Sequence, residues 1–304
     1  MASSQSDAIK VLYKGWIDAM SANPDMGLDE MRDIFEHWGD ITDEPGEVDY
    51  AEVDAGGVQA MWAVPKGCAE DRVVVCTHGG GYVTGSMYTH RKVFGHLAKQ
   101  IGCKALILHY RRAPEAPHPA QVDDAVAAYE WLLSQGYTND HICTSGDSAG
   151  GALCTSMLLA IRDQGLPMPV AAMPMSPWYD PEGTGESLVT NADKDAIVNK
   201  DVLMGMAGMF LGDGSPKDPL ANLLCADLKG LPPIYIQTGG DEGLLDDSVR
   251  FEEKAKAAGV DVTLDIFPEM QHVFHFMAGR APEADDGIAK YAAWVNRNWA
   301  YKPS

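Results

Sequence analysis

Hydrophobic residues recur at helical spacing near the start of the chain. Between residues 8 and 20, apolar side chains recur at intervals of three and one, which is typical of an amphipathic helix. Residues 28–38 continue with a second helical face. Both helices precede the first predicted strand, so they must pack on elements formed later in the chain. Two roles are open for residues 1–45: part of a cap over a functional site, or simple cover for the core.

After residue 47 the pattern changes to short apolar runs that alternate with helical segments. A hairpin is predicted where the runs 48–53 and 58–64 flank Asp54-Ala55-Gly56-Gly57. Further strands are predicted at 72–77, 104–110, 141–145, 170–175, 233–238 and 262–267. Helices are predicted at 88–101, 121–135, 152–161, 200–211, 246–258 and 284–299. This alternation predicts an α/β fold, with about eight strands in a mostly parallel sheet and helices on both faces.

A sharp turn, Gly146-Asp147-Ser148-Ala149-Gly150-Gly151, separates a predicted strand from a predicted helix. In that context G-x-S-x-G acts as a nucleophile elbow, on which the serine hydroxyl stands out at the edge of the sheet. Glycine on either side supplies positions without side-chain bulk where strand and helix nearly touch. A plain glycine-rich loop is the alternative, and the flanking strand and helix favour the elbow.

A serine hydroxyl becomes a good nucleophile only with a base to take its proton and an acid to orient that base. His272 follows the last predicted strand and is the leading base, with His275 as the alternative inside a helical turn. The strand before it is followed by Asp241 and Glu242, of which only one can face the imidazole. The order serine, acid, histidine is that of α/β-hydrolases.

Backbone donors for a developing oxyanion are expected close to Ser148. The N–H of Ala149 is one candidate. The run His78-Gly79-Gly80-Gly81 follows a predicted strand and can bring further N–H groups near, since glycine carries no Cβ. The run lacks the lysine and spacing of a phosphate-binding loop and the G-x-G-x-x-G of a dinucleotide site.

Several motifs taken together resemble one known group of enzymes. They are His78-Gly79-Gly80-Gly81-Tyr82, Tyr110-Arg111-Arg112-Ala113-Pro114-Glu115, the serine turn, and the late acid and histidine. In this order they resemble the hormone-sensitive-lipase-like group of bacterial carboxylesterases, over about residues 48–299. The resemblance implies an eight-stranded hydrolase core, a helical cap and a carboxylic-ester substrate. The catalytic roles that it implies are Ser148 as nucleophile, His272 as base, and Gly80, Gly81 and Ala149 as oxyanion donors.

The sequence departs from the group's pattern at two places. Arg112 stands where leucine is usual, which changes a local contact but no catalytic role. The group often has D-P-L-x-D at the acid. Residues 242–246 fit that spacing without a gap, which favours Glu242 as the acid, whereas Asp241 requires one extra residue.

The resemblance also divides the chain into parts. Residues 1–45 are expected to join the cap, and 46–304 to form the catalytic domain, with a cap insertion at about 181–215. The helix 200–211 is rich in methionine, which suits an adaptable pocket wall, although ordinary core packing explains any single methionine equally well. The expected substrate-binding residues are Tyr82, Met204, Met209 and Phe210.

The 44 acidic and 23 basic side chains give a net charge of −21, which disfavours nucleic acid and anionic membranes as partners. Small, mainly neutral substrates are expected. There is no signal-peptide pattern and no membrane-length apolar run, and the six cysteines are scattered without a C-x-x-C pair. These features favour free thiols in a cytoplasmic protein. No metal or cofactor is expected, and a homodimer paired through an edge strand remains open.

The sequence therefore predicts a serine carboxylesterase that acts on a small ester. A lactonase using the same triad is the first alternative, because a cyclic ester opens by the same steps. A non-catalytic small-ligand receptor is the alternative of another class. Plant gibberellin receptors resemble the group but have lost the catalytic histidine, whereas His272 is present here. Serine at position 148 argues against a dehydratase, and an amidase is left open.

Overall fold

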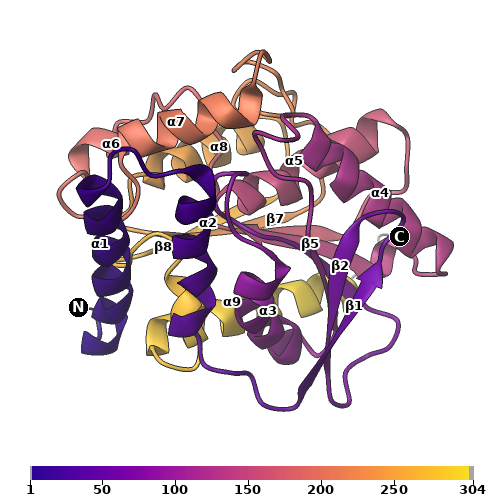
Figure 1. Ribbon diagram of the computed structural model, residues 1–304. Helices are drawn as coiled ribbons and strands as arrows, with labels where there is room; N and C mark the ends of the chain where they lie inside the picture. Colours follow the sequence, from indigo (N-terminus) through magenta and orange to yellow (C-terminus); the bar gives the residue numbers. More distant parts are fainter. Residues whose placement is uncertain (1, 301–304) are drawn as a thin grey trace.

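The computed structural model describes residues 2–300, and its centre is an eight-stranded sheet (Figure 1). The strands, in chain order, are β1 Val48–Asp54, β2 Gln59–Pro65, β3 Val73–Thr77, β4 Lys104–Leu108, β5 Ile142–Asp147, β6 Ala171–Met175, β7 Ile234–Gly239 and β8 Val262–Phe267. Their order across the sheet is β1-β2-β4-β3-β5-β6-β7-β8. Strand β2 pairs antiparallel with both neighbours, and the other pairs are parallel. The predicted α/β class and mostly parallel sheet are confirmed.

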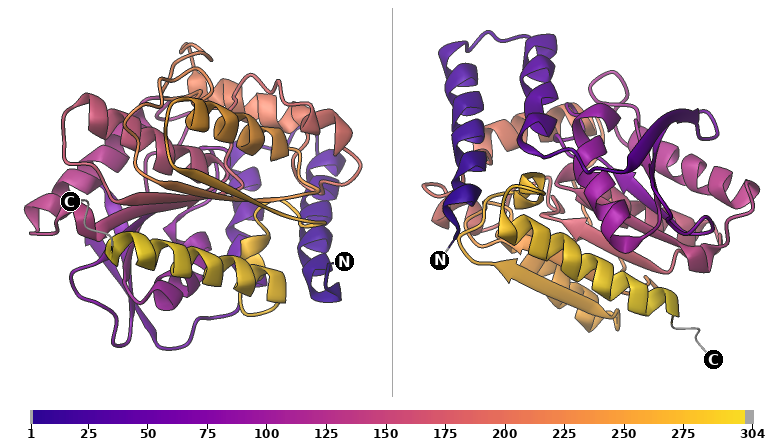
Figure 2. Two further views of the ribbon diagram at one scale, coloured as in Figure 1. Left: turned by 180° about the vertical axis from the view of Figure 1, so that it is seen from behind. Right: turned by 90° about the horizontal axis from the view of Figure 1, so that it is seen from below.

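Helices cover both faces of this sheet. They are α1 Asp7–Ala22, α2 Leu28–Glu36, α3 Met87–Ile101, α4 Ala120–Ser134, α5 Ala149–Asp163, α6 Ser187–Thr190, α7 Lys200–Leu211, α8 Leu245–Ala257 and α9 Pro282–Ala300. Helices α3 and α9 lie on one face, and α4, α5 and α8 lie on the other (Figures 1 and 2). Strands β3, β5, β6 and β7 are buried along their whole length, as expected for central parallel strands with helices on both faces.

The two N-terminal helices pack through aromatic side chains. Trp16 and Phe35 lie 4.9 Å apart between ring centroids, and both contact Trp38 in the 3-10 segment His37–Ile41. Trp38 also stacks on Phe276, at 4.8 Å and an interplanar angle of 12°. Phe276 belongs to the 3-10 turn Phe274–Met277, just beyond the predicted base. The N-terminal helices thus cover the part of the core that supports the histidine loop.

Several boundaries differ from the sequence prediction, and one short helix was not expected. Helix α5 begins at Ala149 rather than at residue 152, so that Ser148 alone separates it from β5. The turn can be this short because Gly146 and Gly150 let the two backbones touch. Strand β4 ends at Leu108 rather than at residue 110. The short helix α6 was not predicted, since four residues show too little periodicity.

Candidate active site

Ser148 lies on a strained turn between β5 and α5. Its backbone has φ 53° and ψ −121°, a conformation rarely adopted by residues with a side chain. A Cβ on Gly146 would clash with the Gly150 carbonyl, and a Cβ on Gly150 would clash with the Thr77 carbonyl. The Ser148 N–H donates to the Met175 carbonyl at 2.9 Å, which fixes the turn to β6. The serine therefore stands at the N-terminus of α5, where the helix dipole is positive.

His272 and Glu242 form a buried pair. Nδ1 of His272 lies 2.6 Å from Oε2 of Glu242, and the side chains are 4% and 0% exposed. The other carboxylate oxygen of Glu242 accepts hydrogen bonds from the Gly239 N–H, at 2.6 Å, and from the Thr238 hydroxyl. Burial lowers the pKa of His272, but the hydrogen bond to Glu242 and the nearby carboxylates outweigh it, and the pKa is raised above its ordinary value.

Asp241 points away from this pair. Its backbone N–H donates to the Met270 carbonyl at 3.1 Å, and its carboxylate lies 3.8 Å from Lys10 and 3.9 Å from Lys194. The loop after β7 thus directs one carboxylate to the imidazole and the other to two lysines. Of the two acids that the sequence offered, it is Glu242 that the structure brings to His272.

His275 lies in a separate buried environment. Its Nε2 is 2.8 Å from Oε1 of Gln237, and its ring lies 5.9 Å from that of Tyr291. Burial, together with repulsion from His272, lowers its pKa to about 3, so the ring stays neutral at physiological pH. The structure does not bring His275 to the Glu242 carboxylate.

The glycine loop after β3 lies beside the serine turn. Gly80 and Gly81 have φ of 105° and 62°, and a Cβ on Gly81 would clash with Met206. Within the described residues neither glycine N–H donates a hydrogen bond to the protein. Ala149 is the first residue of α5, where a backbone N–H has no partner inside its helix. Three N–H groups are thus available near Ser148.

Residues of two other motifs help to fix the position of the glycine loop. The Asp147 carboxylate, next to the serine, accepts from the Gly79 N–H at 3.1 Å. Arg112 donates through Nη1 to the Gly85 carbonyl at 3.0 Å. Arg112, which stands where leucine is usual, therefore binds the end of this loop. This hydrogen bond is the changed local contact that the sequence predicts.

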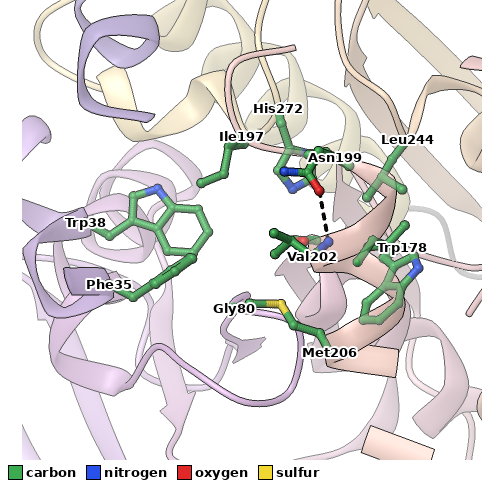
Figure 3. Close-up of a pocket in the computed structure, with 14 residues that line it drawn as sticks. Phe35, Trp38, Gly80, Trp178, Ile197, Asn199, Val202, Met206, Leu244 and His272 are labelled. Carbon is green, nitrogen blue, oxygen red and sulfur yellow. Dashed lines mark hydrogen bonds between the residues drawn. The ribbon is translucent and has the colours of Figure 1, made fainter. Parts of the chain in front are cut away.

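A mostly apolar pocket opens above Ser148 and His272 (Figure 3). Its lining comes from the N-terminal segment, the glycine loop, the serine turn, the loop after β6, the segment 197–206 and the acid and histidine loops. The residues are Phe35, Trp38, Gly80, Gly81, Ser148, Trp178, Ile197, Val198, Asn199, Val202, Leu203, Met206, Leu244 and His272. Trp38 and Phe35 face Val202 and Met206 across the open space. Among these residues, none carries an aspartate, glutamate, lysine or arginine side chain.

The four side chains expected to bind substrate lie outside this lining. Tyr82 and Phe210 stack on each other, with ring centroids 3.8 Å apart, and both are buried. Met204 is 38% exposed on the outer side of α7. Met209 packs against the core, whereas Met206 reaches the pocket. The pocket-lining set Asn199, Val202, Leu203 and Met206 follows the spacing i, i+3, i+4, i+7, so helical periodicity was the signal that could have identified it.

Ser148 and His272 line the same pocket, although no hydrogen bond joins them in the described part of the chain. Hydrogen bonds between catalytic groups are often long without substrate and shorten in the complex. In residues 2–300, no helix is long and apolar enough to cross a membrane, and no cluster of three potential metal ligands occurs.

Comparisons with known proteins show the family to which this fold belongs. The model of a family with the alpha/beta hydrolase fold matches residues 74–276. An acetyl-hydrolase of Streptomyces hygroscopicus is 39% identical over 260 residues, which cover 86% of this chain and 85% of that relative. An esterase of Acinetobacter venetianus is 37% identical over 219 residues, which cover 72% of each chain.

Solved structures extend the likeness to nearly the whole chain. A crystal structure of an esterase from the bacterial hormone-sensitive lipase family superposes with a TM-score of 0.94 at 41% identity, covering 98% of this chain and 100% of that one. The esterase EstE5, from a crystal soaked with p-nitrophenyl butyrate, superposes with a TM-score of 0.92 at 39% identity, covering 99% and 100%. The chain therefore belongs to the α/β-hydrolase family and, within it, to the hormone-sensitive-lipase group of carboxylic ester hydrolases.

Proposed function

We propose that this protein hydrolyses small, mainly neutral carboxylic esters through an acyl-enzyme on Ser148. The observation that carries the proposal is the buried Glu242–His272 pair, which opens into the same pocket as a serine held on a strained turn. A receptor without turnover has no need of a base oriented in this way. The names of the relatives, an acetyl-hydrolase and several esterases, support the same substrate class.

The proposed reaction begins with attack by Ser148 Oγ on the ester carbonyl carbon. Nε2 of His272 takes the hydroxyl proton, and Glu242 stabilises the imidazolium through Nδ1. The N–H groups of Gly80, Gly81 and Ala149 stabilise the negative charge on the former carbonyl oxygen. The tetrahedral intermediate collapses as the alcohol leaves with the proton from His272. Water, deprotonated by His272, then attacks the acyl-enzyme and releases the acid and the free serine.

The pocket lining supports a preference for uncharged substrates. A charged acyl or alcohol group would lose its hydration among tryptophan, leucine, isoleucine and valine side chains without gaining an ionic partner there. We propose that Phe35 and Trp38 act with the segment 197–206 as a cap over the ester. Tyr82 and Phe210 then support this wall from behind, through their stacked rings.

Hydrolysis of p-nitrophenyl butyrate by the purified protein tests the proposal, with Ser148→Ala as the control. We expect release of p-nitrophenol by the wild type and a loss of about 10⁶-fold in kcat in a folded variant. Equal activity in both proteins would overturn the proposal. A folded wild type without activity would be assayed on a panel of lactones, since lactonase activity through the same triad is the alternative. Inertness there as well would favour a receptor.

A further inference from the structure

A segment beyond the core, residues 187–198, is tied to both loops that carry the Glu242–His272 pair. Ser187 donates through Oγ to the Gly243 carbonyl at 2.6 Å. Asn191 donates through Nδ2 to the Glu242 carbonyl at 3.0 Å. On the other side, Gln271 accepts from the Ala196 N–H at 2.9 Å and donates to the Lys194 carbonyl at 3.0 Å. The segment thus bridges the acid loop and the histidine loop.

Asp195 is the carboxylate at the centre of this bridge. Its Oδ1 accepts from the N–H groups of Ile197 and Val198, both at 2.8 Å. Its Oδ2 accepts from the Gly243 N–H at 2.6 Å. Ile197 and Val198 line the pocket, and Gly243 directly follows Glu242. One partly buried side chain therefore holds the pocket wall and the acid loop in a fixed relation.

The charge of Asp195 also acts on the base. The groups that interact electrostatically with His272 are Glu242 on the acid loop, Asp195 on the bridging segment, Asp147 beside the serine and the neutral ring of His275. Tyr13, on α1, faces the same carboxylates. Burial raises the pKa of Asp195 above its ordinary value, and the nearby His272 and three backbone N–H groups offset this only in part. The negative charge of Asp195 favours the protonated form of His272.

On the basis of the proposed triad, we propose that Asp195 is a positioning residue for ester hydrolysis. Through the Gly243 N–H it sets the position of Glu242, and through its charge it supports the imidazolium that forms during each acyl transfer. It touches neither the substrate nor the reacting atoms. The same carboxylate also holds Ile197 and Val198. One side chain therefore links the position of the pocket wall to the proton affinity of His272.

The test replaces Asp195 with asparagine and compares it with Asp193→Asn, a change of the same kind at an exposed position of the same segment. Asparagine can still accept from Ile197 and Val198, but it presents an NH₂ group to the Gly243 N–H and carries no charge. With p-nitrophenyl butyrate we expect kcat to fall by about tenfold, as when an outer partner of a functional group is removed, with a smaller change in KM. The midpoint of the acidic limb of kcat/KM should move to lower pH. Asp193→Asn should keep all three values.

The midpoint is the deciding value, because it does not depend on the fraction of the protein that is folded. A midpoint for Asp195→Asn equal to that of the wild type overturns the proposal. If Asp195→Asn does not fold, Asp195→Ser removes the same charge and is judged by the same midpoint. Ser148→Ala, measured in parallel, separates the two proposals. Activity retained in Ser148→Ala refutes the proposed function, whereas an inactive Ser148→Ala with an unshifted Asp195→Asn refutes only the role of Asp195.

Discussion

The adjacent carboxylates Asp241 and Glu242 leave the backbone in different directions after β7. Glu242 reaches inward, where Oε1 accepts from Gly239 and Thr238 and Oε2 meets His272. Asp241 reaches outward to Lys10 and Lys194, with its side chain 20% exposed. Three hydrogen bonds hold the inward carboxylate in one orientation. The outward ion pairs are long and solvated, and pairs of that kind contribute little.

Replacing Glu242 with glutamine should abolish most of the activity while keeping the shape of the site. The Gly239 and Thr238 donors select the amide oxygen, so the amide NH₂ faces Nδ1 of His272. That arrangement favours the ring tautomer with its proton on Nε2, which cannot accept the serine proton. We expect kcat for p-nitrophenyl butyrate to fall by roughly 10⁴-fold.

Asp241→Asn is the matched control for this change, since it neutralises the neighbouring carboxylate. Among the described residues its carboxylate pairs with lysines alone, so kcat should stay within about twofold of the wild type. A loss in Asp241→Asn as deep as that in Glu242→Gln would transfer the role of the acid to Asp241.

The pH dependence of hydrolysis should report the raised pKa of His272. The base acts only when neutral, so kcat/KM falls as the pH drops through its pKa. Because that pKa is raised, we expect the midpoint of the acidic limb above about 6.5, the ordinary value for histidine. His275 stays neutral over this range, so His275→Asn should leave the midpoint in place. A midpoint that follows His275→Asn instead of His272 would contradict the assignment of the base.

At the residue scale, functional residues whose position depends on local backbone geometry could be predicted from the sequence. Residues whose role depends on contacts between distant parts of the chain could not. The position of Ser148 follows from glycines that the turn requires, and Glu242 follows from the spacing of its loop. Asp195 lies in no recognisable sequence motif. Its hydrogen-bond partner Gly243 is 48 positions further along the chain, so no local pattern links the two. Only the folded chain brings these two residues together.

Helix α7 illustrates the same distinction at the scale of elements. The sequence predicts the helix correctly, but its methionine content alone does not tell which methionines face the pocket. Met206 shares the inner face with Val202 and Leu203, whereas Met204 lies on the opposite, exposed face. The methionine content of α7 predicts a pocket wall in this region, and the helical spacing of its apolar residues indicates which side chains form it. The N-terminal helices could not be placed from their own pattern, because their partners Phe276 and His272 are more than 200 residues away.

Helix α1 supports the histidine loop through one hydroxyl. Tyr13 donates to the backbone carbonyl of His272 at 3.0 Å and accepts from Nε1 of Trp38 at 3.1 Å. Tyr13→Phe leaves both buried groups without this partner, which should lower the free energy of unfolding by about 1–3 kcal/mol. Chemical denaturation measures that change, and kcat should fall as well. Tyr88→Phe removes an exposed hydroxyl bonded to Glu52 and should change little. Equal stability of Tyr13→Phe and the wild type would contradict this account of α1.

The first turn of α8 contains a buried carboxyl whose ionisation opposes folding. Asp247 accepts from the Tyr179 and Asp180 N–H groups at 2.8 and 2.9 Å. Burial raises its pKa to about 8, and the neighbouring Asp180 charge adds to the effect. The unfolded chain loses this proton near pH 4, whereas the folded chain keeps it to about pH 8. The folded state therefore binds more protons between these values, and this group's contribution to stability falls as the pH rises through that window.

Asp247→Asn should remove that pH dependence. One amide oxygen can accept from both N–H groups, and the side chain carries no charge at any pH. Relative to the wild type, the Tm of the variant should rise progressively between about pH 4 and 8, by several degrees at the upper end. Asp193→Asn, at an exposed position, should show no such trend. A Tm difference that stays constant with pH would show that Asp247 is ionised in the folded protein at neutral pH.

At the scale of the whole molecule, the net charge of −21 can influence substrates before they reach the pocket. Apart from the base His272, the pocket lining carries no ionisable side chain, so it offers a charged ester no aspartate, glutamate, lysine or arginine as an ionic partner. The acidic excess produces a negative potential around the molecule. Such a field acts on diffusion to the pocket, and salt screens it over about 10 Å at 0.1 M ionic strength. Added salt weakens the long-range electrostatic effect on substrate diffusion but not the apolar contacts in the pocket. The salt dependence of hydrolysis can therefore separate the two effects.

Three butyrate esters of similar size, with a cationic, a neutral and an anionic alcohol, make this separation measurable. As the salt concentration rises, kcat/KM should fall for the cationic ester, rise for the anionic ester and stay nearly constant for the neutral one. The neutral ester should have the highest kcat, because the apolar lining removes water from a charged group without replacing it. The neutral ester also controls for effects of salt on the fold. Equal salt dependence for all three esters would mean that the surface charge has no part in substrate selection. In that case the apolar wall formed by Phe35, Trp38 and α7 would determine it alone.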